Sequence, residues 1–139
     1  MKKNGLAVAL VVGITVLSGC NKSNIISETD LLHHRFVLIK ANNDNISSEN
    51  QLELVFGENM HITGKMCNHF SSQVSLKDGI IKGSAIAMTK MLCNDEQLDK
   101  LDLTIKQLIS KGAHISLNKD QLILKNDNDK LIYQLKDLM

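Results

Sequence analysis

The sequence predicts an α+β fold: an antiparallel, curved or cracked β-barrel-like sheet of about eight short strands, with one long helix packed across it. Two observations predict it. Short runs of alternating or β-rich residues, separated by turn sequences, recur along most of the chain after residue 30. One segment, residues 94–111, instead has its apolar residues at helical spacing. Closing such a sheet removes strand edges that would otherwise aggregate.

The first half of the domain is predicted to consist of strands. Residues 35–39 form a β-rich run, and residues 51–56 alternate polar and apolar side chains as a half-buried strand does. Further strands are expected at residues 60–67, 73–76 and 80–88. Lys77-Asp78-Gly79 is a hairpin sequence, so the last two of these strands should pair antiparallel.

A single long helix follows, beginning near Asn94, whose side chain can accept hydrogen bonds from the free amides of the first turn. Asp95 and Glu96 suit the positive end of the helix dipole, while Lys111 and Gly112 supply a C-terminal charge and a left-handed stop. One apolar face is formed by Leu98, Leu101, Ile105, Leu108 and Ile109. Three more strands in a meander are expected at residues 113–117, 121–125 and 130–135.

The N-terminal segment predicts export. Lys2 and Lys3 precede an uncharged apolar stretch, residues 6–16, that is too short to span a bilayer comfortably as a permanent helix. The stretch ends in Leu17-Ser18-Gly19-Cys20, which matches the lipobox, where small residues admit the signal peptidase and the cysteine thiol accepts a diacylglycerol. The alternatives are an ordinary cleaved signal or an uncleaved anchor.

Lipidation at Cys20 defines the expected organisation of the chain. Residues 1–19 are a signal peptide, residues 20–30 a lipidated N-terminus and flexible tether, and residues 31–139 one domain. A triacylated, palmitate-bearing cysteine holds a protein on a leaflet without further contacts. Asn21 is not the Asp that resembles an inner-membrane retention signal, so we expect a lipid-anchored outer-membrane protein whose domain faces the periplasm.

Composition restricts the partners and the core. The net charge is +1, and Lys and Arg are scattered among Asp and Glu, so no basic stripe is available and we expect no nucleic-acid partner. Proline and tryptophan are absent and aromatic residues make up 3% of the chain, so the core must be built from Leu, Ile, Val and Met.

Two cysteines remain once Cys20 is lipidated. Cys67 and Cys93 form an even pair in a small exported domain, where such a pair is usually a disulfide. The alternative is two buried thiols that never meet. The two are not in a C-x-x-C arrangement, so a thioredoxin-type redox role has no support.

Two segments resemble the signatures of the META domain family: Gly64-Lys65-Met66-Cys67-Asn68-His69-Phe70 and Ala87-Met88-Thr89-Lys90-Met91-Leu92-Cys93. The resemblance also covers residues 33–38 and 131–139, and so nearly the whole mature domain. It departs from the family pattern at Phe36, where Trp is common, and at Ser72, where a Gly often follows the Asn-x-Phe segment.

The resemblance implies a stress-associated envelope lipoprotein, linked to heat shock and drug tolerance, whose molecular activity is not established. The META fold is similar to that of small secretin pilot lipoproteins, whose cracked β-barrel can hold an acyl chain; this is an analogy of fold alone. We assign a structural role to the signature residues Gly64, Met66, Asn68, Phe70, Met88 and Thr89. Asn68, beside a strand end, can cap backbone amides and fix the turn.

No residue pattern predicts catalysis, a cofactor or a metal. Five histidines lie in separate segments without ligand spacing, and scattered or internally satisfied side chains are the better account: His33, His34, His61, His69 and His114. Four methionines near the cysteines resemble soft copper ligands but more often fill core gaps: Met60, Met66, Met88 and Met91. No serine lies in a G-x-S-x-G or S-x-x-K motif, so we do not expect an enzyme.

Two functions stay open from the sequence. The first is a non-enzymatic interaction module, membrane-tethered through its lipid, that contacts other envelope proteins under stress as a chaperone or assembly helper. The second is a carrier that holds a lipid or small apolar ligand in the barrel beneath the helix. A co-purifying ligand of fixed mass in native mass spectrometry would favour the carrier, and a clean apo mass the interaction module.

Overall fold

The computed structural model describes residues 5, 13, 14 and 25–138. Cys20 and most of the predicted signal peptide at residues 1–19 lie outside these residues. Within the described part of the chain, no helix has both the length and the apolar character needed to cross a membrane.

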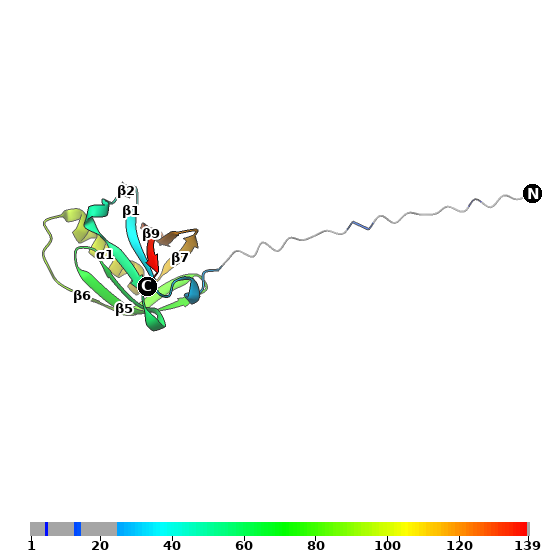
Figure 1. Cartoon of the computed structure of the whole chain (residues 1–139), viewed down its shortest axis with the longest axis horizontal. Helices are drawn as coiled ribbons and strands as arrows, with labels where there is room; N and C mark the ends of the chain where they lie inside the picture. The colour runs from blue at the N-terminus through cyan, green and yellow to red at the C-terminus, as the bar shows by residue number, and fades with distance from the viewer. Residues whose placement is uncertain (1–4, 6–12, 15–24, 139) are drawn as a thin grey trace, which may run out of the picture.

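The described residues form nine strands and one α-helix, whose arrangement is seen in Figure 1. The elements are β1 (His34–Ala41), β2 (Asp44–Asn45), β3 (Glu53–Phe56), β4 (His61–Lys65), β5 (His69–Lys77), β6 (Ile80–Met88), α1 (Glu96–Lys111), β7 (Ala113–Asn118), β8 (Gln121–Lys125) and β9 (Lys130–Leu138). Three short 3₁₀ turns are η1 (Glu28–Asp30), η2 (Ser48–Asn50) and η3 (Glu58–Met60).

The strands form a closed antiparallel barrel. Every strand from β3 onward pairs with the next one in sequence, and β1 pairs with both β3 and β9, which closes the sheet. The two-residue strand β2 is added to the end of β1. The expected α+β, barrel-like architecture is therefore confirmed, with eight strands in the barrel and β2 as an extra pairing.

The barrel is weakly joined between β6 and β7, and the helix lies beside this opening. The two strands pair only at Ile80 with His114 and at Ile81 with Ala113, although β6 continues to Met88. Helix α1 connects β6 to β7 and packs against β6. A long helix across a cracked barrel is what the sequence predicted.

Close packing of the helix depends on Gly83 in β6. A Cβ atom at this position would lie 2.8 Å from Ile109 Cγ2 on α1 and would overlap Ser72 Oγ on β5. Ser72 is 4% exposed and its hydroxyl donates to the Ala85 carbonyl at 2.5 Å, at a bulge between β5 and β6. Ser72 therefore lies within a continuous strand, and no tight turn follows Phe70.

Apolar side chains fill the interior. The largest fully buried ones include Tyr133, Phe36, Phe56, Leu38 and Leu54. Phe36 and Phe56 pack edge to face, with ring centroids 6.0 Å apart. Burial raises the pKa of the Tyr133 phenol, whose hydroxyl has no hydrogen-bond partner among the described residues. This hydroxyl is thus an isolated polar atom in an apolar core.

Some predicted boundaries were wrong. The helix N-cap is Asp95 rather than Asn94, because the Asp95 carboxylate accepts from the Gln97 and Leu98 amides at 2.9 and 3.4 Å. Strand β5 begins at His69, four residues earlier than predicted, and β9 runs to residue 138. Strand β2 and the three 3₁₀ turns, which are short and lack a period, were not predicted.

The domain also begins earlier than the predicted boundary at residue 31. Ile26, which we assigned to the tether, is 8% exposed and belongs to the core. The Ser27 amide and hydroxyl donate to the Asp30 carboxylate at 2.8 and 2.7 Å, and these bonds hold the pKa of Asp30 below its usual range. Residues 26–30 are therefore part of the folded domain.

Candidate functional site

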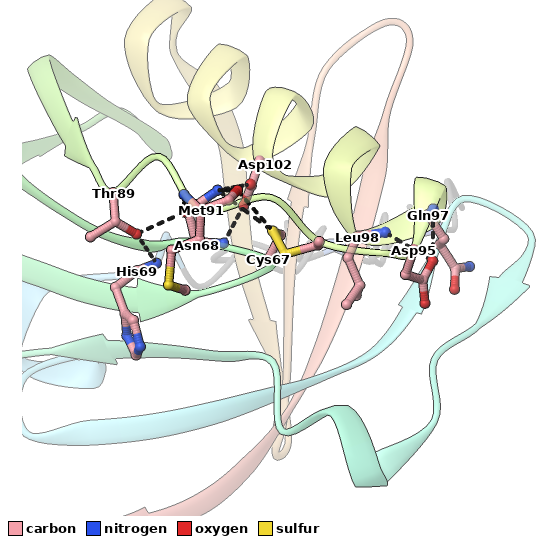
Figure 2. The surroundings of a disulfide bond; sticks show 10 residues. Cys67, Asn68, His69, Thr89, Met91, Asp95, Gln97, Leu98 and Asp102 are labelled. Carbon is pink, nitrogen blue, oxygen red and sulfur yellow. Dashed lines mark hydrogen bonds between the residues drawn. A yellow bond between two sulfur atoms is a disulfide. The ribbon is translucent and has the colours of Figure 1, made fainter.

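The most connected polar group of the described residues is the side chain of Asn68, in the turn between β4 and β5. Its amide nitrogen donates to Asp102 Oδ2 at 2.8 Å and to the Met91 carbonyl at 3.2 Å. Its amide oxygen accepts from the Met91 amide at 2.6 Å and from the Thr89 hydroxyl at 2.8 Å. One side chain thus connects three segments of the chain (Figure 2).

Backbone groups complete this arrangement, which we call the Asn68 network: Asn68, His69, Thr89, Met91 and Asp102. The Asn68 amide donates to Asp102 Oδ1 at 3.0 Å, so the carboxylate accepts from both the main chain and the side chain of Asn68. The His69 amide donates to Thr89 Oγ1, and the Thr89 amide to the His69 carbonyl. Asn68 accepts from one backbone amide, that of Met91, which belongs to the loop after β6 and not to the turn that contains Asn68. Thr89 belongs to the same network.

Asp102 is the member of this network that the sequence analysis missed. Its side chain is 8% exposed and lies on the buried face of α1 together with Leu101 and Ile105. The signal was present, because Asp102 follows Leu98 by four residues and precedes Ile105 by three. A carboxylate in the middle of an apolar helix face requires a buried donor, and Asn68 provides it.

A disulfide joins Cys67 and Cys93 beside the network, with their Cα atoms 6.0 Å apart. Cys67 lies in the β4–β5 turn directly before Asn68, and Cys93 lies two residues before the helix N-cap. Asn68 Nδ2 is 3.5 Å from Cys67 Sγ. The disulfide and the Asn68 network therefore hold the same loop, residues 89–95, at two neighbouring points.

This doubly held loop presents apolar side chains to solvent. Leu92 is 100% exposed and Met91 is 51% exposed; we call these two residues the apolar tip. Both backbone polar groups of Met91 bond to Asn68, and Cys93 directly follows Leu92. Leu103, next to Asp102 on the helix, is a further exposed apolar side chain at 62%. The exposed side chains of Met91 and Leu92 do not contribute to the core although their backbone is held in place. Exposed apolar groups of this kind are typical of interaction sites.

A shallow groove of about 500 Å³ lies next to this loop. Its lining residues come from the ends of β4, β5 and β6 and from the residue that follows β6: Thr63, Gly64, His69, Phe70, Ser71, Ala87, Met88 and Thr89. A Cβ at Gly64 would overlap the Phe70 ring and would lie 2.5 Å from the Glu53 carbonyl oxygen. Gly64 therefore admits the Phe70 ring, which explains a structural role for both signature residues.

The remaining predicted residues are scattered. Met60 and Met66 are buried in the core, and Met88 is half-buried against it. The five histidines do not meet in a group of potential metal ligands; His33, for example, lies 3.3 Å from the Glu58 carboxylate at the surface. In the described part of the chain, three potential ligand atoms come within 4.8 Å of one another only at Cys67, Cys93 and Asp99.

The apolar tip and the start of the domain lie on opposite sides of the molecule. In Figure 1, the blue segment at residues 25–30 lies at one side and the yellow-green loop between β6 and α1 at the other. The pairing of β3 agrees with this view. The His33 amide, next to the start of the domain, donates to the Phe56 carbonyl at the end of β3. Glu53, at the start of β3, pairs with Lys65, just before the turn that contains Cys67.

Comparisons with known proteins identify relatives of this chain. The model of the META domain matches residues 29–137. The heat shock protein HslJ of Escherichia coli (strain K12) is 40% identical over 142 residues, which cover 100% of this chain and 99% of that protein. An NMR structure of a protein 40% identical in sequence superposes with a TM-score of 0.75 and covers 79% of this chain and 95% of its own.

A more distant solved structure has the same fold. The NMR structure of a protein from Burkholderia xenovorans is 18% identical, has a TM-score of 0.64 and covers 78% of this chain and 86% of its own. At this identity the likeness concerns the fold alone. The fold is therefore kept while most of the sequence changes.

Proposed function

The chain belongs to the META domain family, and from this premise we propose that it is a lipid-anchored, non-enzymatic interaction module that serves the envelope under stress. Its domain faces the periplasm from the outer membrane and contacts other envelope proteins through the apolar tip. Its relative is named a heat shock protein, which supports a role in heat stress. We extend the proposal to drug tolerance, which the resemblance to the META domain family implies.

The observation that carries this proposal is the exposure of Leu92 in a loop held at both sides. A mobile loop loses conformational entropy when it binds, whereas a loop already fixed by a disulfide and a buried network loses less. The exposed side chains of Met91 and Leu92 supply apolar area that a partner can bury. Pre-organisation and exposed apolar area together favour recognition of another protein.

The position of the proposed anchor supports the same function. Cys20 and Ile26 are six positions apart in the sequence, a separation that spans at most about 20 Å. A lipid at Cys20 therefore keeps the side of the domain that carries residues 25–30 near the membrane, and the apolar tip, on the other side, is directed away from the anchoring leaflet. A protein partner fits this geometry better than the anchoring leaflet.

Crosslinking in living cells tests the interaction. A photo-crosslinking amino acid at position 92 is expected to give a discrete adduct that increases after heat shock, while the same probe at the exposed position 28, on the opposite side, gives none of that mass. Asn68→Ala in the position-92 chain should reduce the adduct, because the loop is no longer held. Absence of an adduct at position 92, or the same pattern at positions 92 and 28, contradicts the proposed site.

Labelling with radioactive palmitate tests the anchor separately. Cys20→Ala should abolish incorporation and leave the uncleaved precursor, whereas Cys93→Ser should retain incorporation. Continued labelling of the Cys20→Ala chain would refute the lipobox without affecting the proposed interaction site.

The carrier function remains a second candidate because of Tyr133. Its fully buried hydroxyl has no partner among the described residues and points to a polar group that a bound molecule would supply. Such a ligand would carry one polar group and an apolar body, and the side chains that fill the barrel would have to move apart to admit it. Native mass spectrometry of the protein from its own host is expected to give the apo mass if the interaction module is correct, and an added fixed mass if the carrier is correct.

A further inference from the structure

A third potential metal ligand lies next to the two sulfur atoms of the disulfide, in a region that we call the disulfide corner: Cys67, Cys93 and Asp99. Cys67 Sγ, Cys93 Sγ and a carboxylate oxygen of Asp99 all lie within 4.8 Å of one another. They come from the β4–β5 turn, the loop before the helix and the helix itself. Cys67 is buried, Cys93 half-buried and Asp99 exposed, so the group opens to solvent on the side of the carboxylate.

The Asn68 network should keep these atoms together after the disulfide is reduced. Asn68 bonds to both backbone groups of Met91, two residues before Cys93, and to Asp102 on the helix that carries Asp99. None of these bonds involves the disulfide. After reduction these hydrogen bonds still connect the same segments, and the two thiols stay close to each other and to Asp99.

One neighbouring contact also favours sulfur in its anionic form. Asn68 Nδ2 lies 3.5 Å from Cys67 Sγ and shares its two hydrogens among this sulfur, the Met91 carbonyl and the Asp102 carboxylate. Amide donors to sulfur are typical of the surroundings of metal-bound thiolates, where they orient the ligand and stabilise its charge. The corner thus contains two sulfur ligands, one carboxylate and a donor behind one of the sulfurs.

We propose that the reduced protein binds a thiophilic divalent cation, Zn²⁺ being the best fit, through Cys67, Cys93 and Asp99. A dithiol reductant first converts the disulfide into two thiols and is itself oxidised to a disulfide. The cation then displaces one proton from each thiol and is held by two thiolates and one carboxylate oxygen, with water in the fourth position of a tetrahedron. Reduction of the disulfide is thereby coupled to metal binding beside the apolar tip.

Cobalt and zinc titrations test this site in the full chain, solubilised in detergent and carrying Cys20→Ala so that Cys67 and Cys93 are its remaining cysteines. After reduction and removal of the reductant, Co²⁺ should produce a sulfur-to-cobalt charge-transfer band that Zn²⁺ abolishes. The oxidised chain and the Cys93→Ser chain should not produce it. A reduced chain without the band, or an oxidised chain with the same band, overturns the proposal.

The carboxylate is tested with a matched pair on the same helix. Asp99→Asn should weaken Zn²⁺ binding at least about tenfold. Loss of a group that only supports a metal ligand usually costs this much, and loss of a ligand itself should cost no less. Glu96→Gln changes an exposed carboxylate outside the group and should have the same affinity as the parent. Equal affinities of the two variants overturn the three-ligand site. Far-ultraviolet circular dichroism follows folding, and a reduced chain that is unfolded with or without Zn²⁺ also counts against it.

Discussion

At the scale of single residues, Asn68 and Asp102 determine the candidate site. Both are almost fully buried, and removal of either would leave polar atoms of the other buried without a hydrogen-bond partner. Asn68 could be identified from the sequence as a turn-fixing residue. Asp102 could not be paired with it, because the partner lies 34 residues away and the pairing depends on how the helix returns to the barrel.

Replacement of Asn68 should destabilise the domain strongly. Asn68→Ala leaves a buried carboxylate with fewer donors and removes the acceptor for Met91 and Thr89, so we expect the free energy of unfolding to fall by about 3 kcal/mol. Urea unfolding measures the change. Asn45→Ala, at an exposed position in β2, is the control and should stay within about 0.5 kcal/mol of the parent. A similar small effect at both positions would refute the network's importance.

Removal of the Tyr133 hydroxyl, unlike that of the Asn68 amide, is expected to stabilise the domain. Because its buried hydroxyl lacks a partner among the described residues, Tyr133→Phe should raise the free energy of unfolding by about 1 kcal/mol. The phenol ionises more readily in the unfolded chain than in the fold, so its contribution to stability is complete below about pH 10 and decreases above it. The Phe variant should lose less stability at alkaline pH. A clear destabilisation at neutral pH would indicate that the hydroxyl has a partner, as the carrier function requires.

At the scale of elements, the contact between α1 and β6 closes the cracked side of the barrel. The helix and the hairpin at Asp78 and Gly79 were predicted because both have local signals, a 3.6-residue period and a turn sequence with positive φ at both residues. The start of β5 was not, since Ser71 and Ser72 lack strand propensity and are held by pairing with β4 and β6. Strand ends set by neighbours have no signal in their own sequence.

A methyl group at Gly83 tests this contact. Gly83→Ala would press against Ile109 and Ser72, and we expect a loss of about 1 to 3 kcal/mol in the free energy of unfolding because a packed interior does not expand easily. Ser84→Ala, one residue along the same strand and exposed, is the matched control. If thermal melts of the two variants coincide, the helix does not pack on β6 as closely as described.

At the scale of the whole molecule, the disulfide and the Asn68 network hold one side of the barrel, and the segment that leads to the proposed anchor lies on the other. The disulfide was predicted because two cysteines remain in a domain expected to be exported to an oxidising compartment, without any knowledge of the distance between them. The exposed apolar tip between them was not, because exposure of Leu92 depends on a loop path that no local pattern encodes.

Loss of the disulfide should lower stability without unfolding the chain. Cys67→Ser with Cys93→Ser removes a cross-link between residues 26 apart, and we expect a decrease of about 3 to 4 kcal/mol from the greater entropy of the unfolded chain. Thermal denaturation of parent and variant, with and without reductant, measures it. Reductant should lower the melting temperature of the parent alone; equal melting temperatures throughout would contradict a stabilising disulfide.

The central claim is that a buried network holds an exposed apolar loop still, and amide hydrogen exchange at Met91 tests it most directly. The Met91 amide donates to Asn68 Oδ1 at 2.6 Å although its side chain faces solvent. In NMR spectra of the detergent-solubilised chain, this amide should exchange much more slowly than those of Lys90 and Leu92, and Asn68→Ala should remove the difference. If Met91 exchanges as fast as Lys90 and Leu92 in the parent protein, the loop is not held and the proposed interaction site loses its physical basis.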